Sequence, residues 1–129
     1  MIKLSFCLVR LPHLTREAFQ AYWLETHGPL VASVAGALQI RRYVQTHSLP
    51  AEVQAGIRTS RDAPQEFDGV AELWFDSLEA MAANGALPQA QAAAALLLED
   101  ERRFIDLPKS PLWFSREHVI VNVAQVTRL

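Results

Sequence analysis

The chain has 129 residues, of which half are apolar and a fifth charged, as expected for one ordinary globular domain. Twelve basic residues against 14 acidic ones give a formal net charge of −2, and the arginines form no basic stripe, so nothing favours nucleic acid binding. The single cysteine, Cys7, excludes an internal disulfide and a thiolate zinc site, and no segment has the roughly 18 apolar residues of a membrane span. We therefore expect a cytoplasmic protein.

The N-terminal part of the chain predicts a strand followed by a helix. Residues 2–9 alternate between two faces, as a strand does. Thr15 is expected to cap a helix. The Gly28-Pro29 pair directly after His27 predicts that this helix ends there, with a second short helical piece over residues 30–38. The buried stripe of the first helix is expected to contain Phe19, Tyr22, Trp23 and Thr26.

The middle of the chain predicts two strands on either side of a long connection. Residues 39–47 and 69–75 have the alternation and the β-branched and aromatic content of strands. Between them, residues 50–67 carry mixed charges and two prolines, and predict one weak helical turn around residues 51–57. A connection of this length in a small domain is usually functional or disordered.

The C-terminal part predicts two helices and a last strand. Ser77 is expected to cap a helix that is broken at Asn84-Gly85, and Pro88 suits the first turn of a longer helix that reaches Phe104. The sequence "HVIVNVAQV", residues 118–126, is the expected last strand.

The order strand, helix, strand, strand, helix, strand predicts a ferredoxin-like βαββαβ fold of the α+β class over residues 1–129. Its four-stranded antiparallel sheet would carry both helices on one face. The opposite face would stay bare, although several strands place apolar residues on it. Because a large exposed apolar face is unfavourable, we expect a homodimer in which two sheets pack together.

The sequence lacks the motifs of several classes of enzyme. It has no Gly-rich dinucleotide loop, no P-loop and no nucleophile elbow. The four histidines do not occur at the i, i+4 spacing of a helical metal site, so we expect no metal and no cofactor. Proton transfer by a histidine, with a tyrosine or arginine as hydrogen-bond donor, is the chemistry that remains.

One candidate group lies on the second strand. Tyr43, Gln45 and His47 share one face of that strand. If this face is turned toward the helices, it lines a pocket whose opposite wall contains Trp23 and His27. The alternative is a polar face of an edge strand that is exposed to water.

Three further residues are candidates for the site, and two of them have a structural alternative. His27 is either an acid or base at the mouth of the pocket, or a helix-end histidine that the dipole favours. Trp74, in "VAELWF", is a candidate pocket wall. Glu72 in the same strand requires a partner, for which Arg41 or Arg42 on the neighbouring strand would serve, unless it acts as a general base.

Several stretches resemble the EthD family of dimeric α+β barrel proteins. They are "MIKLSFCLVRLPHLTREAFQAYWLETHGPL", "IRRYVQTH", "FDGVAELWFDSLEAM" and "FIDLPKSPLWFSREHVIV", and the most specific are "YWLETHGPL" and "DGVAELWF". The resemblance covers the chain from Met1 to about Val123. It implies the fold above and a dimer that forms a barrel. Relatives of this fold include cofactor-free monooxygenases, polyketide cyclases, dehydratases and isomerases.

Three kinds of function follow from these observations. The first is a cofactor-free enzyme, an oxidoreductase, cyclase or dehydratase, that binds an apolar, aromatic or polyketide-like molecule. In it Trp23, Tyr43 and Trp74 would form walls, and His47 or His27 would move protons. The second is an accessory protein that binds a hydrophobic intermediate of an oxidative pathway without catalysis. The third is a dimeric structural module that needs no pocket.

Overall fold

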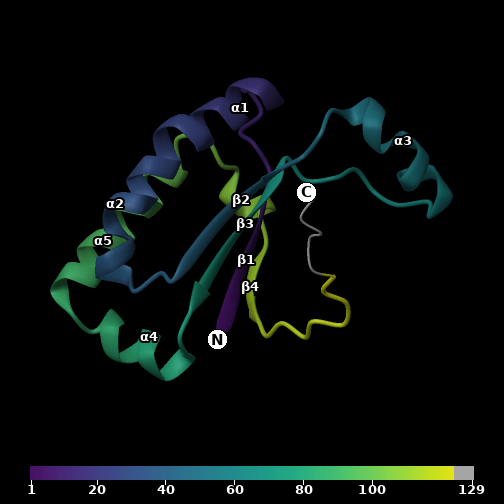
Figure 1. Ribbon diagram of the computed structural model, residues 1–129. Coiled ribbons are helices and arrows are strands. Elements are labelled where there is room, and N and C mark those ends of the chain that lie inside the picture. Colours follow the sequence, from purple (N-terminus) through teal and green to yellow (C-terminus); the bar gives the residue numbers. More distant parts are fainter. Residues whose placement is uncertain (124–129) are drawn as a thin grey trace, which may run out of the picture.

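The computed structural model describes residues 1–123 and contains a four-stranded antiparallel sheet in the order β2-β3-β1-β4 (Figure 1). The strands are β1 (Ile2–Leu8), β2 (Arg42–His47), β3 (Gly69–Phe75) and β4 (Leu112–Ser115). The predicted ferredoxin-like α+β fold is therefore confirmed, with β2 and β4 at the two edges.

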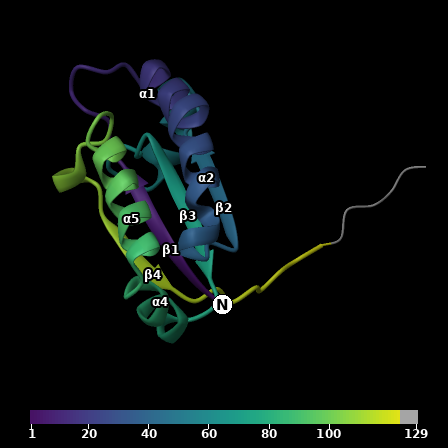
Figure 2. The same cartoon turned by 90° about the vertical axis from the view of Figure 1, so that its left-hand side faces the viewer.

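Helices cover one face of this sheet, as Figures 1 and 2 show. One layer is formed by α1 (Arg16–Tyr22), the π-helical turn η1 (Trp23–His27), α2 (Gly28–Leu38) and α5 (Pro88–Glu101), with α4 (Leu78–Gly85) beside its end. Helix α3 (Ala51–Ser60) lies on the other side of the sheet, and a short 3₁₀ turn, η2 (Leu107–Lys109), precedes β4. No helix within residues 1–123 is both long and apolar enough to cross a membrane.

The predicted helix starts are confirmed by their capping hydrogen bonds. The side chain of Thr15 accepts a hydrogen bond from the backbone N–H of Ala18 at 3.1 Å, and that of Ser77 accepts one from Ala80 at 3.0 Å. The helical turn predicted around residues 51–57 lies within α3, but it was predicted too short, because α3 has ten residues and extends to Ser60. Glu52 in its first turn and Arg58 in its last both complement the helix dipole.

The last strand is β4, and its predicted position at residues 118–126 was wrong. β4 begins directly after Pro111 and pairs with Lys3–Phe6 of β1 in antiparallel register, with Ser115 opposite Lys3. Ser115 is opposite Lys3, and β1 begins at Ile2, only one residue before Lys3. Residues 118–123 therefore extend past the end of the sheet and have no strand to pair with. They form no strand despite their alternating sequence, and residues 124–126 lie outside the described part.

The register of the sheet assigns each strand residue to a face. Tyr43 is opposite Leu73, and both lie on the helix-covered side, whereas Trp74 lies on the uncovered side, which we call the open face. Glu72 is on the open face and pairs with Lys3 of β1 at 2.7 Å. The expected ion pair of Glu72 therefore forms, but its partner is not Arg41 or Arg42; Arg41 pairs with Asp76.

The core between helices and sheet is aromatic. Its largest fully buried side chains are Trp23, Phe19, Phe104 and Leu8. The ring of Phe19 lies 5.8 Å from that of Trp23 and 5.5 Å from that of Phe104, within the range of favourable aromatic pairs. These contacts fasten α1 and η1 to the end of α5, which positions the site described below.

Gly69, the first residue of β3, has no room for a side chain. A Cβ atom there would lie 2.4 Å from Cζ3 of Trp23 and 2.8 Å from the carbonyl oxygen of Thr46. Because both neighbours are held in the packed interior, we expect Gly69→Ala to lower the free energy of unfolding by about 2 to 3 kcal/mol in urea denaturation. Gly56→Ala in α3 is the control, since nothing lies within 4 Å of its Cβ and alanine favours helix. Equal stability of the two variants would contradict the prediction.

Candidate functional site

The histidine of "ETHGP" lies in a π-helical turn, and the helix continues through it. The backbone N–H of Gly28 bonds the carbonyl oxygen of Trp23, five residues earlier, and Gly28 itself has helical φ and ψ. The prediction that Gly28 and Pro29 end the helix was therefore wrong. Pro29 occupies the first turn of α2, where its missing N–H is tolerated. π-turns inside helices occur frequently at functional sites.

His27 is buried and paired with a carboxylate. Its exposed fraction is 5%, and its Nδ1 lies 2.7 Å from Oδ2 of Asp100, which is 3% exposed and comes from the last turn of α5. The imidazole also packs on Phe104, with ring centroids 5.0 Å apart. The prediction of a His27 side chain exposed at a helix end was wrong, because its imidazole is buried and is oriented by a hydrogen bond to Asp100.

Asp100 accepts three hydrogen bonds. Besides His27, the hydroxyl of Tyr22 donates to it at 2.6 Å and the guanidinium of Arg103 at 3.1 Å. Burial alone would raise the pKa of Asp100, but the hydrogen bonds from Tyr22 and His27 outweigh it and hold this pKa below its ordinary value. Asp100 is thus a carboxylate at neutral pH, which requires that His27 carries its proton on Nδ1.

His27 is neutral at pH 7 in this arrangement. Burial lowers the pKa of His27 below its ordinary 6.5, and the hydrogen bond and charge of Asp100 offset the effect only in part. With Nδ1–H donated to Asp100, Nε2 keeps a free lone pair. A neutral imidazole oriented by a buried carboxylate is an arrangement suited to general base catalysis.

The imidazole lines a small chamber between helices and sheet. The chamber has a volume of about 40 Å³, room for one small group, and most of its lining is apolar. Besides Trp23, whose indole N–H can only donate a hydrogen bond, three of its residues carry groups that can exchange protons: His27, Tyr43 and Glu101. Burial, reinforced by the negative charge of Asp100, raises the pKa of Glu101 to about 7. Glu101 is therefore protonated in part of the molecules at neutral pH.

An apolar cleft of about 350 Å³ adjoins this chamber. The two share Phe6, Leu73, Leu97 and Glu101 in their walls, so Glu101 lies where the cleft and the chamber meet. Other cleft residues come from β1, α2, α4 and α5, including Leu4, Leu38, Met81 and Ala94. The arrangement suits a molecule with an apolar body and one polar end.

The three candidate residues of β2 form a chain of hydrogen bonds. His47 bonds Oε1 of Gln45 through Nε2 at 2.8 Å, and the amide nitrogen of Gln45 donates to the hydroxyl oxygen of Tyr43 at 2.8 Å. The same nitrogen donates to the Trp23 carbonyl of the π-turn at 2.9 Å. Because the Tyr43 oxygen accepts from Gln45, its own proton is free to be donated into the chamber.

His47 lies outside the chamber. It stacks on Trp23, with ring centroids 4.4 Å apart and planes at 24°, and burial lowers its pKa. The face of β2 that carries it is turned toward the helices, as one of the two alternatives predicted. The structure thus brings Tyr43, Trp23 and His27 to the chamber, whereas Gln45 and His47 support Tyr43 from behind.

Trp74 cannot form a wall of this site, because it lies on the open face. Its indole N–H bonds Glu117, and Lys3 and Arg42 lie 5.5 and 5.0 Å from its ring. Cys7, with its pKa raised by burial, is a buried thiol and not an activated one. Within residues 1–123, no three His, Cys, Asp or Glu side chains gather as a metal site would require.

Asp100 and Glu101 are functional candidates that the sequence reading did not single out. They stand in "LLLEDERR", which resembles a charged helix end exposed to water. A signal was nevertheless present, because Asp100 continues the buried spacing of α5. The buried residues there are Ala90, Ala93, Leu97 and Asp100, followed by Phe104.

The model of the EthD domain matches residues 11–108. The chain belongs to the EthD family. An EthD family protein from Bacillus halodurans shares 19% identity with this EthD protein, with a TM-score of 0.59 and coverage of 92% of this chain and 99% of that one. The comparison with curated proteins finds no match.

Two further solved structures share the fold of the EthD protein. A dimeric protein of unknown function with a ferredoxin-like fold from Bacteroides fragilis is 8% identical, with a TM-score of 0.56 and coverage of 90% and 95%. A candidate antibiotic biosynthesis monooxygenase from Deinococcus radiodurans is 14% identical, with a TM-score of 0.51 and coverage of 97% and 100%. At these identities the likeness concerns the fold alone.

Proposed function

We propose that this EthD protein is a cofactor-free enzyme that transfers protons on an apolar carbonyl compound. The observation that carries the proposal is the hydrogen bond of 2.7 Å between His27 and the buried Asp100, at the wall of a chamber that Tyr43 and Glu101 also line. A base, a hydrogen-bond donor and a group with a pKa of about 7 therefore surround one small space.

The reaction class follows from these three groups. Nε2 of His27 removes a proton from the carbon next to the carbonyl, and the electron pair moves to form an enolate, whose oxygen Tyr43 stabilises. In a dehydration, protonated Glu101 gives its proton to a hydroxyl group on the next carbon, which leaves as water while the carbon–carbon double bond forms. In a cyclisation, the enolate carbon attacks a second carbonyl of the same molecule, the π bond of that carbonyl breaks, and its oxygen takes the proton of Glu101.

The substrate body is expected to be apolar and uncharged. The cleft that adjoins the chamber is lined mainly by aliphatic and aromatic side chains, and no lysine or arginine among residues 1–123 lines either space. An anion would have no cationic partner there and would lie beside Glu101. An aromatic or polyketide-like ketone meets these conditions.

A model ketone tests this function. The probe is 1-tetralone, an uncharged bicyclic ketone, and the measurement is deuterium exchange at its acidic carbon in D₂O, followed by NMR. We expect the protein to accelerate exchange above buffer, and His27→Asn to lower that acceleration at least 100-fold. Asparagine retains a donor toward Asp100 but lacks Nε2.

The control for this variant is His118→Asn, at an exposed position outside the site. It is expected to exchange like the wild type. If the protein binds 1-tetralone but does not accelerate exchange, the chain is an accessory protein that holds an apolar molecule, and the catalytic proposal fails.

We further propose that two copies associate through their open faces. This face carries no helix layer, and Trp113 on β4 is half exposed there. It also contains Cys7, Val44 and Val70. The dimeric protein from Bacteroides fragilis has the same fold, which supports the proposal. Pairing of two such faces would remove the exposed tryptophan from water.

A further inference from the structure

The segment between β2 and β3 leaves the body of the domain as an arm. The arm, residues 48–68, carries α3, which has no buried residue. Figure 1 shows α3 standing apart from the helix layer, on the side of the open face. Figure 2, seen from the helix side, shows α1, α2 and α5 in front of the sheet and no α3 among them. The arm thus contributes nothing to the core of its own chain.

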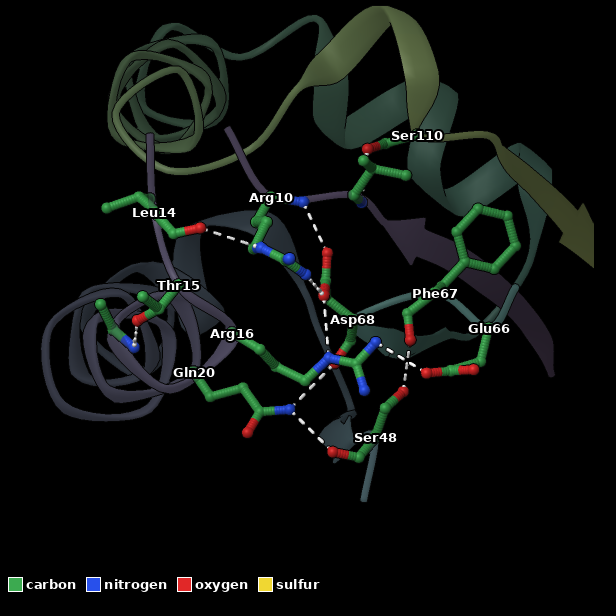
Figure 3. A network of polar contacts seen from close by, with 12 residues as sticks. Arg10, Leu14, Thr15, Arg16, Gln20, Ser48, Glu66, Phe67, Asp68 and Ser110 are labelled. Carbon is green, nitrogen blue, oxygen red and sulfur yellow. Dashed lines mark hydrogen bonds and ion pairs between the residues drawn. The ribbon is translucent and has the colours of Figure 1, made fainter. Parts of the chain in front are cut away.

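The base of the arm is nevertheless fixed by buried charges (Figure 3). Asp68, 4% exposed, accepts the backbone N–H of Arg10 at 2.8 Å and also pairs with the guanidinium of Arg10. Nε of Arg16, in the first turn of α1, donates to the same carboxylate at 3.0 Å, and another nitrogen of Arg16 reaches Glu66 at 2.9 Å.

The two ends of the arm are also tied to each other. The amide nitrogen of Gln20 donates to the carbonyl oxygens of Ser48 and Asp68, at 2.9 and 3.1 Å, and the hydroxyl of Ser48 donates to the carbonyl of Phe67 (Figure 3). Both ends of the arm are therefore held against α1. These contacts fix the direction in which α3 projects from the domain. A surface loop without a function would not require such an attachment.

The arm presents an apolar stripe to solvent. Val53 and Ile57 are four residues apart in α3, which places them on one side of the helix, and Leu49 precedes the helix by two residues. All three are 58 to 62% exposed. Residues 116–123 lie on the same side of the sheet in Figure 1 and contain more exposed aliphatic side chains. These are Val119, Ile120, Val121 and Val123.

We infer that the arm is a dimerisation clasp, whose apolar stripe packs against a second copy of this chain. The inference rests on the proposed pairing of open faces. The arm, the open face and residues 116–123 all lie on one side of the molecule in Figure 1, so a single association can involve all three. Burial of this apolar surface then stabilises the dimer.

The charges of α3 and the turn after it favour this partner over a membrane or a nucleic acid. Glu52 and Asp62 balance Arg58 and Arg61, so this part of the arm has no net charge. Anionic lipid headgroups and phosphates are bound by clusters of basic residues, which the arm lacks. An apolar stripe flanked by balanced charges instead suits a protein surface of similar composition.

The test compares two double variants of α3 that carry the same added charge. Val53→Asp with Ile57→Asp alters the stripe, and Ala55→Asp with Thr59→Asp alters the opposite side of the same helix, which is also exposed. Sedimentation equilibrium between 0.1 and 100 µM measures the dimer dissociation constant. We expect the stripe variant to raise it at least 10-fold, and the control variant to change it less than 3-fold.

Other outcomes would overturn the inference. If the wild-type protein is monomeric at 100 µM, both the proposed clasp and the proposed pairing of open faces are wrong. If Trp113→Glu dissociates the dimer but the stripe variant behaves like its control, the pairing stands and the clasp is wrong. The proton-transfer proposal is judged separately by 1-tetralone exchange, since no arm residue lines the chamber.

Discussion

Asp100→Ala is expected to lower the free energy of unfolding by about 3 kcal/mol at pH 7, measured by urea denaturation. The substitution leaves the Nδ1–H of His27 and the hydroxyl of Tyr22 without the acceptor that they share, and buried donors without partners are costly. The same change removes the group that fixes the tautomer of His27. Exchange of 1-tetralone should therefore fall along with stability.

Glu99→Ala is the matched control for this variant. Glu99 is the neighbour of Asp100 on α5, but its side chain is 70% exposed, and its ion pair with Arg103, at 3.6 Å, lies at the surface. Exposed pairs of this kind contribute roughly 0 to 1 kcal/mol. If the two alanine variants were equally stable, the hydrogen bonds of Asp100 would not contribute the free energy of unfolding that we assign to them.

Glu101→Gln is expected to stabilise the protein in alkaline solution and to leave its stability unchanged in acid. The pKa of Glu101 is raised from 4.5 to about 7 on folding, so the folded state holds a proton that the unfolded state releases between these values. The free energy of unfolding of the wild type must then fall as the pH rises from about 4.5 to about 7. Glutamine resembles the protonated acid at every pH.

The size of this effect follows from the shift. At 1.36 kcal/mol per pKa unit the full shift would give about 3 kcal/mol, and partial exposure of the side chain reduces it to roughly 2 kcal/mol above pH 7. Urea denaturation at pH 4.5 and pH 8 measures the difference, with Glu99→Gln as the exposed control. A gain of equal size at both pH values would show that packing, and not ionisation, causes it.

The face assignment of β2 illustrates how much of the site the sequence predicts. Alternation in "RRYVQTH" places Tyr43, Gln45 and His47 together, and the structure turns that face toward Trp23 as one alternative required. Alternation does not predict which residues of that face lie beside the chamber and which lie beyond it along the strand. His47 lies opposite Gly69 at the far end of β2, behind Trp23, whereas Tyr43 lies opposite Leu73 at the chamber.

Two other features depend on information that no local pattern contains. The strand at Leu112–Ser115 could not be separated from the more strand-like residues 118–126, because the choice depends on where β1 begins. The pairing of His27 with Asp100 joins residues 73 positions apart. That contact depends on the tertiary packing of η1 against the end of α5, where Phe19, Trp23 and Phe104 lie together.

The π-helical turn also keeps the first helix in phase with the sheet. Phe19, Trp23, His27 and Val31 are all buried, and they follow each other at intervals of four residues. In an undistorted α-helix each such interval rotates by about 40° beyond a full turn, so a row of four would wind away from the core. The wider turn at Trp23–His27 absorbs part of this rotation. A chain one residue shorter in this turn would point either its histidine or the start of α2 toward solvent, so the length of "WLETH" is as much a part of the site as its histidine.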